Sequence, residues 1–335
     1  MFITVDCGAT NMRCRLFDGH EILDEICRKA GARNTAFEGT CAPLKAALAI
    51  SIKELLERNS LSEGDIDATL SSGVLASDMG IYYLPHAKAP ASFKESAAAA
   101  RLVVMEEITK IPIFLIPGVK TLPDPGEQDE ERALFLRDSM SGEECETYGI
   151  MSQLGLDGNF VITLPGSYNK AIEVDGTGRI VSVVTGMCGE FIAAISGHTL
   201  LRHSLPRPVI RRIIPEKLIR GFDYCSRHGV SPTLIKARMV QTLGDWTCDE
   251  AANFFVGALL RDDILSVKEL CRPGERDIKV IVGGGNPLRS VFVILLRHIG
   301  IDNIVEVDDE TARRAPSVGA LMVYEEYLAH HRRQA

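Results

Sequence analysis

The stretch ITVDCGATNMRCRLFDG, residues 3–19, holds the first clear folding signal of this chain. Its two apolar runs, residues 3–5 and 12–17, predict paired strands, and the Asp18-Gly19 pair that follows is typical of a tight hairpin turn. The loop between the runs, residues 6–11, is longer than such a turn needs and holds an acid, a glycine and small or amide side chains. We therefore expect this loop to do more than reverse the chain.

Length and composition limit the classes of protein to consider. The chain has 335 residues, more than one core usually supports, so we expect two domains. Hydrophobic residues make up 46% and charged residues 24%, as in soluble globular proteins, and a net charge of −8 argues against nucleic acid or a membrane surface as the main partner. No uncharged run could span a bilayer and no signal peptide is recognisable, so we expect a cytoplasmic protein. Nine scattered cysteines without a C-x-x-C pair predict reduced thiols.

The second half of the chain repeats the pattern of the first half. Gly166 follows Gly8 by 166 − 8 = 158 positions, and Asp175 follows Asp18 by 175 − 18 = 157 positions. This spacing predicts a duplicated α/β unit with a cleft between its halves. The alternative is coincidence, because hairpins with Asp-Gly turns are common. Outside the hairpins we expect helices at residues 40–59, 190–203, 287–299 and 317–328, and strands within residues 20–27, 67–73, 113–116 and 277–286.

The first hairpin loop is suited to binding phosphate. Its backbone N–H groups have no bulky side chain to obstruct them, and such a loop can cradle phosphate oxygens. Asp6, at the end of the strand, is a candidate ligand for a hydrated Mg²⁺ ion, and Arg13 could reach an anion. The alternative is a plain turn that uses glycine for a positive φ. The candidate phosphate-binding residues are Gly8, Ala9, Thr10 and Asn11.

The second hairpin loop, LPGSYNK at residues 164–170, repeats this design. Two opposed loops of this kind suit a nucleoside triphosphate, although neither is a Walker A motif. The GGGNPL stretch after a predicted strand also fails the dinucleotide pattern G-x-G-x-x-G, so it is either a place where adenine approaches the backbone or a tight strand–helix turn. The candidate nucleotide-binding residues are Pro165, Gly166, Ser167, Lys170, Gly283, Gly284, Gly285 and Asn286.

Acidic residues open a predicted helix in the stretch MSGEECE, at Glu143, Glu144 and Glu146. They are either partners of the helix dipole or include a general base that takes a proton from an attacking hydroxyl group or water. The stretch TGMCGE ends another predicted strand and is a candidate to hold a polar substrate through Thr185, Gly186 and Glu190.

Several of these motifs together resemble a known family. The order VDCGATNMRCRLF, FLIPG, MSGEE, LPGSYNK, TGMCGE, VGGGN and SVGAL is similar to that of the 2-dehydro-3-deoxygalactonokinases, bacterial sugar-acid kinases of the actin and hexokinase superfamily. The resemblance is weaker at residues 202–249. It implies two RNase-H-like (actin-like ATPase) domains related by duplication, with a nucleotide cleft between them. The expected domains are residues 1–145 and 146–311, with a C-terminal helix at about residues 312–330 that packs on the first domain.

The resemblance also implies roles for individual residues. It implies ATP and Mg²⁺ as cofactors, with Asp6 at the metal, and the terminal hydroxyl of 2-dehydro-3-deoxy-galactonate as phosphoryl acceptor. A similarity of SGEEC to the glutamate motif of exopolyphosphatases favours Glu144 over Glu143 as the base, although spacing alone leaves the two open. Lys170 is a further catalytic candidate. The candidates for binding the sugar acid are Arg13, Ser72, Gly73, Thr185, Gly186 and Glu190.

The chain departs from the family pattern at three places. Cys7 stands where the family usually has an aromatic residue, Ser141 where it has arginine, and Ser167-Tyr168-Asn169 where it has a Thr-His pair. Because serine cannot grip a carboxylate as a guanidinium does, Arg13 or Arg101 is expected to hold the substrate acid, or the substrate differs. Two alternatives to a kinase are a phosphohydrolase of the same superfamily, such as a polyphosphatase or ATPase, and a degenerate ATP-binding regulator. A homodimer is a further expectation.

Overall fold

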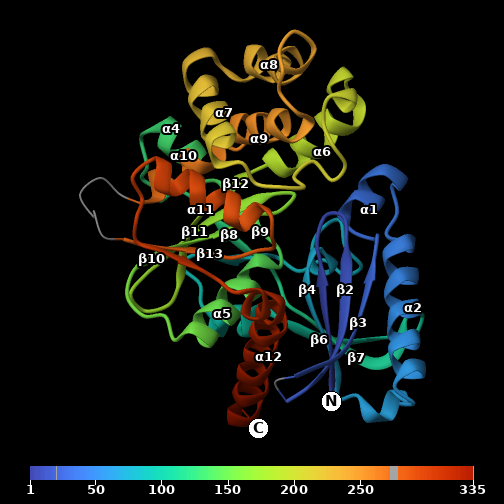
Figure 1. The fold of residues 1–335 in the computed structure, drawn as a ribbon. Coiled ribbons are helices and arrows are strands. Elements are labelled where there is room, and N and C mark those ends of the chain that lie inside the picture. The colour runs from blue at the N-terminus through green and yellow to red at the C-terminus, as the bar shows by residue number, and fades with distance from the viewer. Residues whose placement is uncertain (20, 272–277, 335) are drawn as a thin grey trace. The chain divides into compact units, whose positions relative to one another are not determined.

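The computed structural model describes residues 1–19, 21–271 and 278–334, and the fold is of the predicted α/β class (Figure 1). The chain divides into two compact units. Unit 1 comprises Met1–Gly158, Val174–Val183 and Asp309–Ala335, and unit 2 comprises Asn159–Glu173 and Val184–Asp308. The domain limits expected at residues 145 and 311 stay a prediction.

Unit 1 is built on a six-stranded sheet in the order β3-β2-β1-β4-β7-β6, and the quoted stretch forms its first hairpin. β1 pairs antiparallel with β2 and parallel with β4, so Asp6 lies opposite Arg13 on one side and Ser72 on the other. A small second sheet has the order β5-β8-β9. The strands are β1 Phe2–Cys7, β2 Met12–Asp18, β3 Glu21–Arg28, β4 Ala68–Gly73, β5 Ala87–Lys88, β6 Arg101–Met105, β7 Thr109–Leu115, β8 Val119–Thr121 and β9 Asp138–Met140.

The helices of unit 1 follow the expected signals in most places. The helix predicted at residues 40–59 is α2, and its apolar residues at helical spacing, Leu44, Leu48, Ile52, Leu55 and Leu56, are buried. The predicted C-terminal helix at residues 317–328 is longer on both sides, because α12 continues through Pro316. The helices are α1 Ala32–Glu38, α2 Ala42–Arg58, α3 Phe93–Ala99, α4 Glu130–Phe135, α5 Glu143–Leu154 and α12 Asp309–Gln334, with short 3₁₀ turns η1 Glu63–Asp65 and η2 Val74–Ala76.

The two faces of the main sheet pack against different helices (Figure 1). Ile3 and Val5 belong to the core that includes the buried face of α2. On the other face, Thr4 Oγ1 lies 2.6 Å from Ser317 Oγ of α12. Because side chains alternate along a strand, Asp6 shares the α12 face with Thr4.

Helix α5 crosses α12 with almost no side chain between the two backbones. A Cβ atom at Gly149 would lie 1.9 Å from the Ala315 carbonyl oxygen, and one at Gly319 would lie 1.9 Å from the Cys145 carbonyl oxygen. Only glycine fits at either position, so the two helices approach as closely as backbones allow. This crossing holds α5, whose first turn carries the predicted acids, against the helix that covers β1.

The main sheet of unit 2 has the order β12-β11-β10-β13-β14, which matches the order β3-β2-β1-β4-β7 across the main sheet of unit 1. β10 pairs parallel with β13, and β13 pairs parallel with β14, as β1, β4 and β7 do. The predicted duplication is therefore confirmed at the level of topology. The turn end of the β11–β12 hairpin groups with unit 1. The strands are β10 Phe160–Leu164, β11 Asn169–Val174, β12 Ile180–Gly186, β13 Lys279–Val282 and β14 Ile304–Glu306.

Unit 2 holds a cluster of helices between β12 and β13. The helix predicted at residues 190–203 is two helices, because Thr199 adopts an extended conformation and caps a new turn. Residue 20, at the start of one predicted strand, and residue 277, at the start of another, lie outside the described residues. The helices are α6 Cys188–His198, α7 Pro215–His228, α8 Val230–Thr242, α9 Cys248–Leu259, α10 Arg261–Leu270 and α11 Leu288–His298, with a 3₁₀ turn η3 Leu200–His203.

Across residues 1–19, 21–271 and 278–334, none of the helices combines the length and the apolar character needed to cross a membrane. The predicted cytoplasmic location and the predicted homodimer stay predictions.

Candidate functional site

The first predicted phosphate loop is fixed by the start of helix α1. The backbone N–H groups of Ala32 and Arg33 donate to the carbonyl oxygens of Gly8 and Ala9, at 3.2 and 2.9 Å. A Cβ atom at Gly31 would lie 2.4 Å from the Gly8 oxygen, so the helix start lies directly on the loop. The loop carbonyls therefore point to α1, as a loop that offers N–H groups to an anion requires.

Within this loop, one candidate donor is already used. The Gly8 N–H group donates to the Asn11 carbonyl oxygen at 2.9 Å and closes the turn, and Asn11 Nδ2 donates to Thr10 Oγ1 at 3.2 Å. The loop is thus held in shape by its own polar groups, and the role of its residues in binding phosphate stays a prediction.

Asp6 lies where three segments of unit 1 meet. Its carboxylate is 3.7 Å from the Arg13 guanidinium, and both side chains reach solvent. A Cβ atom at Gly142 would lie 3.7 Å from Asp6 Oδ1 and 3.1 Å from the Gly73 Cα, while one at Gly73 would lie 2.1 Å from the Cys7 carbonyl oxygen. Gly73 and Gly142 both have positive φ angles, of 89° and 111°. Glycine therefore lets the end of β4 and the start of α5 approach the Asp6 carboxylate.

Glu144 is the most perturbed acid of this site. It is fully buried, and both of its carboxyl oxygens accept the Gly142 N–H group, at 3.0 and 2.8 Å. Burial first, and then the charges of Glu143 and Asp6, raise the pKa of Glu144 to about 8 against the opposing effect of its backbone hydrogen bonds. The Glu143 carboxylate is half-buried and accepts the Ser141 N–H group at 3.1 Å. The structure therefore brings the two predicted acids together with Asp6.

The candidates Ser72 and Arg101 of unit 1, and Ser141, which stands where the family has arginine, have partners within the protein. The Ser72 side chain is buried, and its hydroxyl donates to the Val5 carbonyl oxygen at 3.3 Å. Ser141 Oγ lies 3.0 Å from His86 Nε2. Arg101 Nη1 donates to the Ala100 carbonyl oxygen at 2.7 Å. Their part in binding a substrate is untested, and Arg13 is the better placed of the two predicted arginines because it faces Asp6.

The second predicted phosphate loop has the same construction in unit 2. The Gly166 N–H group donates to Asn169 Oδ1 at 2.8 Å, and the Glu190 N–H group at the start of α6 donates to the Ser167 carbonyl oxygen at 3.0 Å. A Cβ atom at Gly189 would lie 2.0 Å from the Gly166 carbonyl oxygen. A helix start therefore fixes this loop as α1 fixes the first one.

The basic residue of the second loop is directed inward. Lys170 is buried, and its Nζ donates to Thr185 Oγ1 at 2.7 Å on the neighbouring strand β12. Next to Thr185, Gly186 lies so close to Asp263 that a Cβ atom would be 2.1 Å from its Oδ1. Unit 2 thus brings together three of the predicted residues and an aspartate that the sequence did not single out.

The predicted adenosine loop follows β13 in unit 2. Gly284 has a φ of 69°, and a Cβ atom there would lie 2.7 Å from the Pro165 carbonyl oxygen, as Gly73 lies against Cys7 in unit 1. Arg289 Nη1 donates to the Gly284 carbonyl oxygen at 3.1 Å. Asn286 Oδ1 accepts the Ser290 hydroxyl at 2.8 Å. The loop is therefore fixed between the second phosphate loop and the start of α11.

Sequence reasoning missed the supporting residues of both loops. Gly31 and Gly189, at the starts of α1 and α6, let these helices lie against the loops. Asp263 in α10 accepts a hydrogen bond from Asn169. A glycine directly at a helix start is a weak signal for the first two. Nothing in the local sequence marks Asp263, because its partner is 94 residues away.

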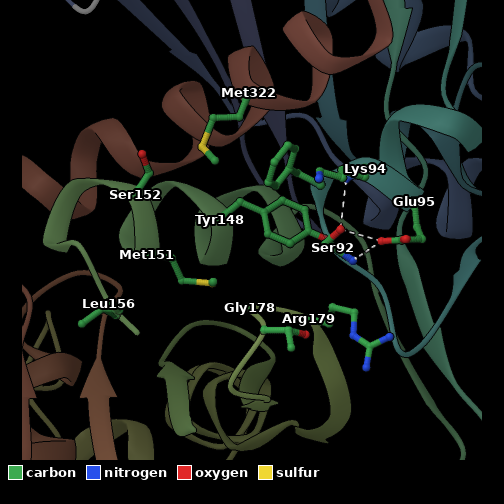
Figure 2. Close-up of a pocket in the computed structure, with 12 residues that line it drawn as sticks. Ser92, Lys94, Glu95, Tyr148, Met151, Ser152, Leu156, Gly178, Arg179 and Met322 are labelled. Carbon is green, nitrogen blue, oxygen red and sulfur yellow. Dashed lines mark hydrogen bonds between the residues drawn. The ribbon is translucent and has the colours of Figure 1, made fainter. Parts of the chain in front are cut away.

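Unit 1 has a separate cavity of about 510 Å³ beside α5, which Figure 2 shows. Its wall combines Tyr148, Met151 and Met322 with polar groups near Ser92 and Arg179. These charges are engaged within the protein, because Arg179 donates to Asp175 and the Glu95 carboxylate accepts from Ser92. None of the predicted site residues lines this cavity, so we do not include it in the candidate site.

Comparisons with known proteins give both a family and a fold. The family model for 2-keto-3-deoxy-galactonokinase matches residues 6–316. The 2-dehydro-3-deoxygalactonokinase of Escherichia coli (strain K12) is 23% identical over 271 residues, which cover 80% of each protein.

Two solved structures share the fold. A Sinorhizobium meliloti protein, described as a candidate 2-dehydro-3-deoxygalactonokinase, has a TM-score of 0.73 at 18% identity and covers 97% of this chain and 96% of its own. The activator of 2-hydroxyisocaproyl-CoA dehydratase from Clostridium difficile, with bound ADPNP, has a TM-score of 0.52 at 12% identity. The match covers 99% of this chain and 97% of that structure's chain. These likenesses confirm the predicted actin-like fold class.

Proposed function

This chain belongs to the 2-keto-3-deoxy-galactonokinase family, which its motifs resemble, and from that premise we propose which phosphoryl transfer it catalyses. Family membership makes the protein a kinase. We propose that it moves the γ-phosphoryl group of ATP to the terminal hydroxyl of 2-dehydro-3-deoxy-galactonate or a close 2-keto-3-deoxy sugar acid. The observation that carries this proposal is the buried Glu144 carboxyl group beside Asp6 in a glycine-lined corner of unit 1.

Glu144 is the proposed general base. Phosphoryl transfer requires the protein to position the two substrates, to neutralise charge on the phosphates and to accept the proton of the attacking hydroxyl. Once ionised, a carboxylate whose pKa is about 8 is a stronger base than an ordinary glutamate, so we expect the rate to rise with pH as Glu144 loses its proton. Glu143 raises the pKa of Glu144 by its charge, so we assign it a supporting role.

Asp6 is the proposed anchor for a magnesium ion. Within the described ranges, the side chains of His, Cys, Asp and Glu form no group of three or more that could enclose a metal. A single carboxylate at a phosphate loop fits Mg²⁺, which keeps most of its waters and takes further ligands from phosphate oxygens. When bound, the ion would neutralise charge on the phosphates, and Asp6 would orient its hydrated shell.

The two loops and Lys170 are the proposed phosphate contacts. Small residues and fixed carbonyls support an arrangement of N–H groups toward phosphate in each loop. Gly283, Gly284, Gly285 and Asn286 are proposed to contact adenosine. Arg13 is proposed to bind the carboxylate of the sugar acid. In unit 2, Thr185, Gly186 and Glu190 are candidates for contacts with its hydroxyl groups.

The test is ADP release from Mg-ATP with a panel of 2-keto-3-deoxy sugar acids, for the wild type and for Glu144→Gln. We expect the galacto acid to accelerate ADP release, and the variant to lose about 10²–10⁴ in rate while it still binds ATP. ADP release that is equal with and without a sugar acid would indicate a phosphohydrolase instead. ATP binding without any turnover would indicate a regulator.

A further inference from the structure

Asp263 lies in the first turn of α10 and is buried. Its Oδ2 accepts a hydrogen bond from Asn169 Nδ2. The Cys188 sulfur lies 3.1 Å from Asp263 Oδ1 and 2.7 Å from the Leu259 carbonyl oxygen, and both oxygens can accept its proton. The Asp263 carboxylate also accepts the Cys188 backbone N–H group. The carboxylate packs directly on the Gly186 backbone. Asp263 is thus surrounded by donors, and one of them belongs to the second phosphate loop.

These contacts decide which way the Asn169 amide points. Burial raises the pKa of Asp263, and the hydrogen bonds from Asn169 and Cys188 oppose that shift. As a carboxylate Asp263 can only accept hydrogen bonds, so the nitrogen of the amide faces it. The amide oxygen then faces the opposite way, toward the Gly166 N–H group, at 2.8 Å. If the amide turned over, nitrogen would face N–H and oxygen would face carboxylate, and both hydrogen bonds would be lost.

A comparison of the two loops shows why this matters. In the first loop the Gly8 N–H group donates to a backbone carbonyl, that of Asn11, whose position the chain itself fixes. In the second loop the acceptor is the side chain of Asn169, which can rotate about a broad terminal torsion. The second loop therefore needs an outside group to fix its acceptor, and Asp263 is that group.

We propose that Asp263 is a positioning residue for nucleotide binding: by fixing the Asn169 amide, it holds the second hairpin loop in the shape that receives the phosphates of ATP. This rests on the proposed function only in so far as that loop binds phosphate. Asp263 reaches the ligand through Asn169 and is not itself a catalytic residue.

The sign of the expected effect separates positioning from simple electrostatics. Asp263→Asn removes a negative charge near a site for polyanions, and that change alone would tighten ATP binding. Asparagine offers one acceptor oxygen where the carboxylate offers two, one to Asn169 and one to Cys188, so the Asn169 amide is held less firmly, the loop loosens and binding weakens. We expect the Kd for Mg-ATP to rise about tenfold, which corresponds to about 1.4 kcal/mol.

The measurement is calorimetric titration of the full-length protein with Mg-ATP in the absence of any sugar acid. Asp263→Asn is compared with wild type and is also introduced into an Asn169→Ala background. Because Asp263 acts through Asn169, Asp263→Asn should cause no further weakening in that background, where only the tightening from the lost charge remains. Asp262→Asn removes the same charge from the adjacent, exposed position and is the matched control, for which we expect no weakening.

Thermal unfolding tests whether each variant is folded. If Asp263→Asn is not folded, Asp263→Ser replaces it, because serine leaves room for a water molecule beside Asn169. An unchanged or tighter Kd, or an equal loss in both backgrounds, overturns the proposal, as does a wild type that binds no nucleotide. Because the titration contains no acceptor, a wrong sugar acid leaves this result unaffected and appears only in the ADP-release assay.

Discussion

Replacing Glu144 by glutamine should change how the stability of this protein depends on pH. Burial, with the charges of Glu143 and Asp6, raises the pKa of Glu144 to about 8 in the folded protein from its usual 4.5. Between these two pH values the folded protein keeps a proton that the unfolded chain has lost, so the free energy of unfolding falls as pH rises. One proton corresponds to about 1.36 kcal/mol per pH unit. From about pH 5.5 to about pH 7.5 the wild type should lose about 2.7 kcal/mol relative to Glu144→Gln.

The assay is urea unfolding of the full chain, followed by far-ultraviolet circular dichroism at a series of pH values. The pH-dependent part of the difference between wild type and Glu144→Gln should be largest above about pH 8, where both folded and unfolded wild type have lost the proton, and should disappear below about pH 4.5, where both hold it. Glu146→Gln, which removes a half-buried carboxylate from the same helical turn, is the comparison, and the pH-dependent change in stability should be larger for Glu144→Gln. Parallel curves for wild type and Glu144→Gln would refute the reasoning, because they would mean that the Glu144 pKa is the same in both states.

Three further predictions concern the acids, the second loop and the thiols. Glu143→Gln removes a charge that raises the pKa of its buried neighbour, so the rise of kcat/KM with pH should move to lower pH; an unmoved profile would contradict this. Gly189→Ala places a Cβ atom 2.0 Å from a carbonyl oxygen of the second loop and should raise the KM for ATP about tenfold or more. Gly197→Ala, in the same helix with no atom within 4 Å, should leave that KM unchanged. In the native protein a disulfide reagent should modify the exposed thiols Cys27 and Cys248 first, and rapid reaction of a buried thiol would show local opening.

The sequence predicted the repeated hairpins because their information is local. Apolar residues at period two and the Asp-Gly turns specify each hairpin without reference to the rest of the chain. The apolar pattern predicts the last helix only at residues 317–328, whereas the family resemblance predicts it at about residues 312–330, closer to α12, which contains Pro316. Contacts between distant segments could not be predicted. Asp263 and Asn169 are 94 residues apart, and nothing near either residue indicates the other.

The two units share a construction but differ in the charge placed on it. In each unit a hairpin loop lies against a glycine at a helix start and against a second glycine after a central strand. Around the first loop the added side chains are acids, which raise the pKa of Glu144 through their mutual repulsion and burial. Around the second loop the added side chain is Lys170, whose Nζ donates to Thr185, and the Asp263 carboxylate is turned to the Asn169 amide. A cationic side chain beside the second loop suits the phosphate binding proposed for that loop, whereas the buried acid beside the first loop suits the proposed proton transfer.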